Sequence, residues 1–505
     1  MAEQKRPNLP ADLTRRGLLM GLLASAATPA LAGAPLVSLR PPAGRGADPA
    51  PGAEILVRKA GLSGQVSFAV ADAQTGELLE SRGDDKQLAP ASVAKAITAL
   101  YALDTLGPSH TFKTSLLATG GVVNGVVQGD LILVGGCDPT TDTRDFAALA
   151  ATMKDAGIRE VRGSFLVYDG LVASVPAIDQ EQPDHVGYNP AVSGIALNFN
   201  RVHFEWKRAG SDYTVTMDAR AGKYRPDVTV SQMKIKARRA PIYTYESREG
   251  RDYWTVAKGA LGREGARWLP VRNPGLYAGE VFSTFARSHG IVLHKPKLTA
   301  SLPLGTILAS IESPRLDVIL KSMLKHSTNL TAEMVGLAAT RARIGRTENL
   351  AGSAAEMNRW AVETLGMDEP AFVDHSGLGD RSRISAPDMV RGLAAAGRRA
   401  ALRPLLKAVK LLDAQGRPVN DHPVKADAKT GTLNFVSGLG GYITTPSGRE
   451  LVFAIFTADF DKRAGIPREA RERPPGARTW ATRSRRLQRR LIMRWGQVYN
   501  VAADG

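Results

Sequence analysis

The stretch Leu88-Ala89-Pro90-Ala91-Ser92-Val93-Ala94-Lys95 decides how the rest of the chain is interpreted. It places a serine and a lysine three residues apart at the start of a helix predicted to run from Ser92 to Leu106, where apolar residues recur at helical spacing. Residues three apart share a helix face, so the Lys95 amine can reach the Ser92 hydroxyl and take the proton that makes it a nucleophile. The helix N-terminus adds backbone N–H groups and a positive dipole end, which favour a developing oxyanion.

Two further short motifs follow this one along the chain. Ser327-Thr328-Asn329 has the pattern S-x-N, and Lys429-Thr430-Gly431 has the pattern K-T-G. A second S-x-x-K, Ser322-Met323-Leu324-Lys325, is interpreted as ordinary helix surface because it lies only a few residues ahead of Ser327. The first S-x-x-K is therefore the one that belongs with the other two motifs.

The composition is that of a soluble globular protein with several domains. The chain has 505 residues, of which 43% are hydrophobic and 23% are charged. The single cysteine, Cys137, excludes an internal disulfide, and beside two glycines it is expected to be a small buried residue rather than a thiol nucleophile. The histidines are scattered, and no phosphate-binding loop is present in the middle of the chain, so neither a metal nor a cofactor is expected.

The N-terminus has the features of an export signal, predicted to occupy residues 1–32. Arg15 and Arg16 precede a short apolar run, and Ala30-Leu31-Ala32 provides a small-residue cleavage site. The paired arginines favour a twin-arginine signal and a periplasmic product, with an ordinary secretory signal as the alternative. The apolar run is too short to span a bilayer. Residues 33–52, rich in Pro, Gly and Ala, are expected to form a flexible leader.

The net charge of +17 is concentrated towards the C-terminus. Residues 461–494 hold twelve Lys and Arg against three acidic residues, a net charge of +9. Such a field attracts polyanions. For an exported protein we expect peripheral contact with anionic lipid head groups or acidic wall polymers and no binding to nucleic acid. The alternative is a solvated basic helix face.

Strands are predicted near both ends of the chain, so the two ends are expected to share one antiparallel sheet. The predicted strands are 66–71, 78–81, 429–433, 440–445 and 451–457. A C-terminal helix with Trp480, Leu487, Leu491 and Trp495 at helical spacing could pack on this sheet. The catalytic domain would then consist of residues 53–106 and 304–505. In the second part of this domain, a helix is predicted to begin at Ser313-Pro314.

The region between these parts, residues 107–303, is predicted to be an insertion of β-rich domains, two in number. Asn124-Gly125 favours a hairpin turn, and further strands are expected at 213–217, 227–236 and 253–257. Helical patterns are fewer, and occur at 146–156 and 279–289. The insertion is expected to serve as a lid or spacer, or to shape the groove beside Ser92.

The three motifs in this order resemble those of class C, low-molecular-mass penicillin-binding proteins, the D-alanyl-D-alanine carboxypeptidases/endopeptidases. The residues that carry the resemblance are Ser92–Lys95, Met323–Glu333, Asp374–Leu378, Lys429–Thr432 and the insert stretch Gly135–Thr140. The long gap between Lys95 and Ser327 differs from class A β-lactamases. His375 stands where the family usually has Gly, which puts the rim of the pocket in doubt. The resemblance implies an α+β fold of the penicillin-binding-protein/β-lactamase type, with a large β-rich insertion.

The resemblance also implies a serine peptidase mechanism that acts on peptidoglycan stem peptides and is inhibited covalently by β-lactams. It assigns catalytic roles to Ser92, Lys95, Ser327, Asn329 and Lys429, and substrate binding to Thr430, Gly431 and Thr432. Ser92 would attack the D-Ala–D-Ala carbonyl, and Lys95 would act as base with a pKa lowered by burial and by Lys429. Ser327 would relay a proton to the leaving amine. Gly431 would let the substrate lie close to the strand.

Two other functions remain open from the sequence. The same fold could host a β-lactamase or an esterase, and a non-catalytic wall-binding or sensor protein is the third reading. Arg381 and Arg383 could meet a second carboxylate of the substrate, such as that of diaminopimelate.

Overall fold

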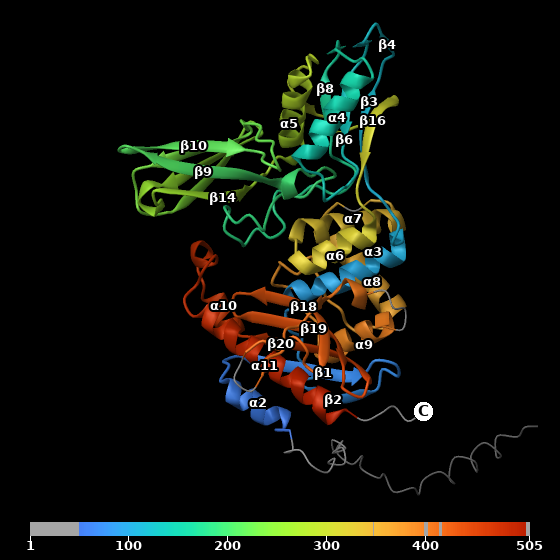
Figure 1. The fold of residues 1–505 in the computed structure, drawn as a ribbon, viewed down its shortest axis with the longest axis vertical. Helices are drawn as coiled ribbons and strands as arrows, with labels where there is room; N and C mark the ends of the chain where they lie inside the picture. The colour runs from blue at the N-terminus through green and yellow to red at the C-terminus, as the bar shows by residue number, and fades with distance from the viewer. Residues whose placement is uncertain (1–49, 347, 398–401, 414–416, 501–505) are drawn as a thin grey trace, which may run out of the picture. The chain divides into compact units, whose positions relative to one another are not determined.

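The computed structural model describes residues 50–346, 348–397, 402–413 and 417–500. The predicted export signal at residues 1–32 and most of the predicted leader at 33–52 lie outside this range. Figure 1 shows the fold coloured from blue at the N-terminus to red at the C-terminus. The core of the lower half combines blue segments with orange and red ones, which means that sequence-distant segments form one domain.

A six-stranded antiparallel sheet is built from both ends of the chain. Its strands, in spatial order, are β17 (Lys407–Ala408), β18 (Lys425–Leu433), β19 (Val436–Thr444), β20 (Glu450–Ala458), β1 (Gln65–Asp72) and β2 (Leu78–Arg82). The key join is between β1 and β20, where Phe68 pairs with Ile455. All five strands predicted for this sheet are present, so the prediction of a catalytic domain split in sequence is confirmed.

The two faces of the sheet are buried in different hydrophobic clusters. Along β20, Phe453 and Ile455 enter one cluster and Val452, Ala454 and Phe456 enter the other, as the alternation of side chains in a strand requires. The first face is covered by α2 (Ala53–Ala60) and the basic α11 (Ala477–Val498). The prediction that the C-terminal helix packs on the sheet is thereby confirmed.

The other face carries the helices that hold the candidate site. They are α3 (Ala94–Leu106), α6 (Leu316–His326), α7 (Asn329–Ile344), α8 (Leu350–Leu365) and α9 (Ala386–Gly397). In α3 every residue from Ala94 to Ala102 is buried, because the helix is surrounded by its neighbours and has no face to solvent over these turns.

The predicted start of α6 at Ser313-Pro314 is wrong. The helix begins at Leu316 after Arg315, and the Ser313 hydroxyl instead accepts a hydrogen bond from the Phe112 backbone N–H at 2.9 Å. Ser313 therefore stabilises the strand connection that enters the helical layer rather than capping the helix.

The insertion contains four sheets and two helices that pack on them. The five-stranded sheet has the order β15 (Lys297–Leu298), β8 (Phe165–Tyr168), β6 (Leu131–Val134), β3 (Lys113–Ala118) and β16 (Thr306–Glu312), with α4 (Thr143–Asp155) and α5 (Pro274–Ser288). The three-stranded sheets are β10 (Asp212–Asp218), β9 (Arg201–Ala209) and β14 (Glu264–Pro270); β11 (Ser231–Lys236), β13 (Arg251–Ala257) and β12 (Tyr243–Arg248); and β4 (Val122–Val123), β5 (Val126–Val127) and β7 (Glu160–Val161).

The structure corrects the predicted limits of the insertion. β16 was assigned to the second catalytic part, but it pairs with β3 along its length, so the insertion ends after Glu312 and not at 303. The strand predicted at 227–236 is shorter and begins at Ser231. The larger sheets share one hydrophobic core, and this gives no support to the expected division of the insertion into two domains.

A segment between α10 (Phe460–Ala464) and α11 reaches from the catalytic domain to the insertion. We call residues 465–476 the α10–α11 segment; it projects in red towards the green strands in Figure 1. Its ion pairs to the insertion join Arg468 to Asp184, Arg471 to Glu181, and Glu472 to both His185 and Arg267. Within the described ranges, no helix combines the length and apolarity needed to cross a membrane.

Candidate active site

Ser92 lies in a tight turn that packs closely against two glycines. The turn is a 3₁₀ segment, Ala91–Val93, that precedes α3, so the serine lies just ahead of the α-helix and not at its predicted first residue. A Cβ on Gly377 would lie 1.9 Å from the Ala91 carbonyl oxygen, and one on Gly431 would lie 2.6 Å from that of Pro90. Only glycine permits this close approach, which fixes the Ser92 turn against β18.

The Lys95 amine is fully buried and donates hydrogen bonds to three acceptors. They are the Ser92 hydroxyl oxygen at 2.9 Å, the Asn329 side-chain oxygen at 2.8 Å and the Ser376 carbonyl oxygen at 2.6 Å. The sequence predicted the contact with Ser92, and the resemblance assigned Asn329 to the same site. Ser376 was quoted only as part of the family pattern, and its carbonyl was not recognised as a partner, because a backbone acceptor carries no signal in side-chain type.

Burial lowers the pKa of Lys95 to about 8, because the charged ammonium loses its hydration. The carboxyl groups of Asp374 and Glu333 oppose this shift by favouring the charged form. The neutral amine, which is the form that can act as a base, is therefore accessible near neutral pH.

Lys429 connects the other two motifs. Its amine donates to the Ser327 hydroxyl oxygen at 3.0 Å and to the Thr430 carbonyl oxygen at 2.6 Å. Burial, followed by the nearby charge of Lys95, holds the pKa of Lys429 well below its ordinary value. Ser327 caps α6 in the left-handed conformation, with φ of 58°, a costly conformation for a serine and one that recurs at functional sites.

A second layer of buried acids supports the Asp374–Leu378 turn. The Glu333 carboxylate accepts the backbone N–H groups of His375 at 3.1 Å and Ser376 at 2.8 Å. Asp374 accepts those of Gly377 and Gly379 at 2.5 and 2.6 Å. Burial raises the pKa of both carboxyl groups, and the charge of Asp374 raises that of Glu333 further, whereas Lys95 lowers both. These contacts fix the Ser376 carbonyl that Lys95 needs.

His375 does not form the pocket rim, which was the point left in doubt. Its side chain is completely buried, lies parallel to the Tyr101 ring and makes a 2.7 Å hydrogen bond to the Ser353 hydroxyl. Burial lowers its pKa to about 3, so the imidazole is neutral in the core. The expectation for Cys137 is confirmed, because the thiol is buried and its pKa is raised to about 12.

The three predicted substrate-binding residues occupy the end of β18 beside Ser92. Thr430 and Thr432 are exposed on one face and Gly431 is buried on the other. The space that the missing Gly431 side chain leaves is filled by the Pro90–Ser92 backbone, a packing requirement for glycine that the sequence did not predict.

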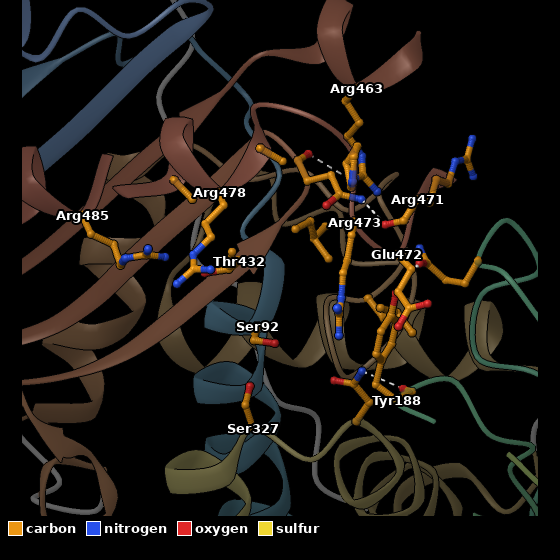
Figure 2. A pocket seen from close by; sticks show the side chains of 18 residues that line it. Ser92, Tyr188, Ser327, Thr432, Arg463, Arg471, Glu472, Arg473, Arg478 and Arg485 are labelled. Carbon is orange, nitrogen blue, oxygen red and sulfur yellow. Dashed lines mark hydrogen bonds between the residues drawn. The ribbon is translucent and has the colours of Figure 1, made fainter. Parts of the chain in front are cut away.

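The exposed side of Ser92 opens into a groove of about 640 Å³. Figure 2 shows Ser92, Ser327 and Thr432 at its floor and five arginines around its wall. The arginines are Arg463, Arg471, Arg473, Arg478 and Arg485. Arg381 and Arg383, predicted to meet a second carboxylate, do not line this groove; the Arg383 guanidinium donates to the carbonyls of Asp380 and Ser382 and lies over the Phe460 ring.

The insertion also contributes to the groove, as one sequence reading expected. Tyr188 and Gln182 line it, and the Asn329 side-chain amide donates to the Tyr188 carbonyl oxygen at 2.9 Å, drawn as a dashed line in Figure 2. Sequence pattern gave no sign of Tyr188, because a single tyrosine in an irregular loop has no recognisable spacing. Among the described residues, no His, Cys, Asp and Glu side chains gather in a way that could hold a metal ion.

The chain matches the family model described as D-Ala-D-Ala carboxypeptidase 3 (S13) over residues 53–472. It is 29% identical over 425 residues to a D-alanyl-D-alanine carboxypeptidase of Actinomadura sp. (strain R39), covering 78% of each chain. It is 22% identical over 419 residues to the D-alanyl-D-alanine carboxypeptidase DacB of Haemophilus influenzae, covering 79% of this chain and 87% of the relative.

The fold is also that of a solved relative. The crystal structure of penicillin binding protein 4 (dacB) from Haemophilus influenzae superposes with a TM-score of 0.70 at 18% identity, covering 88% of this chain and 99% of that one. This likeness supports the predicted α+β penicillin-binding-protein fold. The family model covers the three motifs, both parts of the central sheet and the whole insertion. The chain therefore belongs to the D-Ala-D-Ala carboxypeptidase 3 (S13) family.

Proposed function

We propose that Ser92 is the nucleophile of a serine DD-peptidase that acts on peptidoglycan stem peptides through an acyl-enzyme. The observation that carries the proposal is the contact of the Ser92 hydroxyl with the Lys95 amine at 2.9 Å, with a Lys95 pKa of about 8. A weak alcohol becomes a nucleophile when a neutral amine lies close enough to take its proton. The contact with Ser92 places the Lys95 amine there, and its lowered pKa makes the neutral form accessible.

The residues supply each step of the reaction. The Ser92 oxygen bonds to the D-Ala carbonyl carbon while its proton passes to Lys95. The backbone N–H groups of Ser92 and Thr432 stabilise the oxyanion. Collapse of this intermediate breaks the peptide bond, and the proton taken up by Lys95 is returned to the leaving amine through the Ser327 hydroxyl, which the Lys429 amine orients by its hydrogen bond. Water then hydrolyses the ester and regenerates Ser92.

Substrate binding follows from the charges of the groove. Lys429, Thr430 and Thr432 supply the charge and the hydroxyl donors for the terminal carboxylate. Arg473 and Arg478 have no hydrogen-bond or ion-pair partner for their side chains among the described residues, so they are available to further carboxylates of a stem peptide. Removal of a terminal D-Ala and cleavage of a D-Ala–diaminopimelate cross-link share this chemistry and differ in the leaving amine.

The nucleophile is tested by covalent labelling with penicillin, using the two S-x-x-K copies as a matched pair. Ser92→Ala should abolish labelling, whereas Ser322→Ala, at an exposed position on α6, should label like the wild type. The solved structure of the Haemophilus influenzae protein in complex with a β-lactam supports the choice of probe. Labelling that survives Ser92→Ala would remove the nucleophile assignment.

The reaction itself is tested by digesting purified muropeptides and separating the products. Release of free D-alanine identifies carboxypeptidase activity, and conversion of dimers to monomers identifies endopeptidase activity. Rapid nitrocefin turnover without an accumulated acyl-enzyme would favour a β-lactamase, and binding to wall material without hydrolysis would favour a sensor.

We also propose that the outer face of α11 contacts an anionic surface, a membrane or a wall polymer. A hollow of about 360 Å³ between α2 and α11 is lined by Lys59, Arg483, Arg486 and Arg490. Sedimentation with vesicles containing anionic lipid should carry down the wild type, and vesicles of neutral lipid should not. The combined variant Arg483→Glu, Arg486→Glu and Arg490→Glu should no longer sediment with the anionic vesicles. If this variant sedimented with them as the wild type does, the proposal would be contradicted.

Export to the periplasm is the third proposal, and it is supported by the sequence of residues 1–32 alone. Fractionation of cells that express the full chain should place it in the periplasm. Replacing Arg15 and Arg16 by Lys should block export if the route is of the twin-arginine type, and leave it unchanged if the route is the ordinary secretory one.

A further inference from the structure

A second cavity, larger than the groove, lies between the insertion and the α10–α11 segment and adjoins the groove. This cleft has a volume of about 980 Å³, which is at the upper end of the range of about 300–1,000 Å³ for small-molecule sites. Tyr188, Glu472 and Arg473 line both the cleft and the groove, so the two cavities share a wall. Figure 2 shows these three residues together at one side of the groove.

The walls of the cleft are rich in aromatic side chains from strands of two sheets. They are Trp206, Tyr243, Tyr245, Trp268 and the almost fully buried Trp254, and a loop of the insertion adds Tyr188. Of the cleft residues, Tyr188 is 43% exposed and Ile242 is 51% exposed, both high for large apolar side chains in a folded domain. Apolar surface left open inside a concave site is characteristic of ligand binding.

Most charged groups of the cleft are already paired with one another. Asp184 binds Arg468, and Glu472 binds Arg267. The Arg201 guanidinium lies over the Trp268 ring at 5.5 Å. Of the charged lining residues without an ion pair in the described chain, Glu469 and Arg473 are exposed and of opposite sign, and Arg201 is partly buried with no hydrogen-bond partner for its Nε. Several rings already contact a guanidinium or another ring on one side, as Tyr243 contacts Arg267 and His185. The cleft therefore offers partly open aromatic rings and, among its exposed unpaired residues, no net charge, which suits a neutral polar ligand.

The shared wall is fixed before any ligand binds. The Arg272 guanidinium donates to the carbonyl oxygens of Pro176, Asp184 and Asn189 at 2.7 to 2.8 Å and thereby holds the loop that carries Tyr188. The Asn329 amide holds the Tyr188 carbonyl from the catalytic side. Such a preorganised site loses little entropy when a ligand binds.

We propose that the cleft binds an N-acetylated sugar of the glycan strand whose stem peptide lies in the groove. The identity of this occupant rests on the proposed function. A pyranose ring has apolar C–H faces that stack on aromatic rings, and hydroxyl and amide groups that bond to polar edges. A second stem peptide, the competing occupant, carries several carboxylates, and the cleft offers them only Arg473 at its junction with the groove as an unpaired exposed cation among its described lining residues.

The cleft can be blocked without removing any existing contact. Ala266 is exposed on β14 and lines the cleft, so Ala266→Trp fills it. Thr216→Trp adds the same side chain at an exposed position of β10 outside the cleft and is the matched control. If Ala266→Trp fails to fold, Ile242→Asp, at a position that is already half exposed, replaces it.

The experiment uses the full chain and two readouts. Calorimetry with the trisaccharide of N-acetylglucosamine should detect binding to the wild type and to Thr216→Trp, and binding weakened roughly ten-fold or more in Ala266→Trp. The ratio of kcat/KM for a disaccharide-pentapeptide to that for the free pentapeptide should fall in Ala266→Trp alone, with the free pentapeptide cleaved as by the wild type.

The outcomes separate the two proposals. Trisaccharide binding by a chain without peptidase activity would overturn the proposed function and support the sugar site. Peptidase activity with no trisaccharide binding and an unchanged substrate ratio would overturn the sugar site alone. A loss in Ala266→Trp confined to sugar-free, cross-linked peptides would assign the cleft to a second peptide and overturn the sugar assignment.

Discussion

Lys95 can act as a base only in its neutral form, and its burial determines the pH at which this form appears. Its pKa is lowered to about 8, so the amine is protonated at lower pH and becomes a base as the pH rises through that value. The rate constant for acylation by benzylpenicillin should therefore rise with pH, with a midpoint near 8. Lys95→Met should lower this rate by a factor of roughly 10²–10⁴. Lys325→Met, in the second S-x-x-K, is the control and should leave the profile unchanged; a flat wild-type profile would contradict the assignment.

Gly431 is needed for packing between β18 and the Ser92 turn. A Cβ there would lie 2.6 Å from the Pro90 carbonyl oxygen and 3.0 Å from the Ser92 backbone nitrogen. Gly431→Ala should displace Ser92 and cost about 1–3 kcal/mol of stability. The acylation rate should fall roughly ten-fold or more, because one oxyanion donor moves. Stopped-flow acylation and thermal unfolding measure the two effects. Gly121→Ala, where a Cβ would meet nothing within 4 Å, should change neither.

At the level of helices and strands, α11 stabilises the sheet through one central tryptophan. Trp495 is fully buried between Phe68 and Phe453, with ring centroids 5.7 and 6.0 Å away, and its indole N–H donates to Glu80 at 3.0 Å. Trp495→Ala should cost about 3–5 kcal/mol, seen as a lower midpoint of denaturant unfolding. Trp495→Phe keeps most of the packing and should lose only about 1.5–3 kcal/mol for the hydrogen bond to the Glu80 carboxylate. Equal losses in the two variants would contradict the packing argument.

The elements that sequence predicted are those with a strong local signal. Short runs of strand-favouring residues at 440–445 and 451–457 predicted β19 and β20, and helical spacing predicted α11. β16 was missed as part of the insertion because its partner β3 lies nearly two hundred residues earlier, and pairing over that distance leaves no local pattern. Three motifs predicted the groups around Ser92. Glu333 and the Ser376 carbonyl act through backbone contacts, which residue type alone does not reveal.

On the scale of the whole molecule, the chain leaves the catalytic domain after α3, forms the insertion and returns to complete the sheet. The α10–α11 segment then contacts the insertion again. Both cavities are consequently formed by residues from the two parts, as the lining of each by Tyr188 and Glu472 shows. The geometry of both cavities therefore depends on the stability of the contact between the α10–α11 segment and the insertion.

Glu472 is the centre of that contact, and its titration gives a test with a defined sign. A hydrogen bond with His185, together with the charge of Arg267, lowers its pKa from 4.5 to about 2. A carboxyl group whose pKa is lower in the folded state stabilises the fold above its unfolded value and loses this contribution as the pH falls through the folded one. Glu472→Gln should therefore lower the melting temperature near neutral pH. The difference from the wild type should shrink between pH 4.5 and about 2. Glu469→Gln, which removes an exposed neighbouring charge without an ion pair in the described chain, should show no such dependence. A constant difference for Glu472→Gln across this range would mean that the carboxylate contributes to packing alone and that charge does not hold the α10–α11 segment to the insertion.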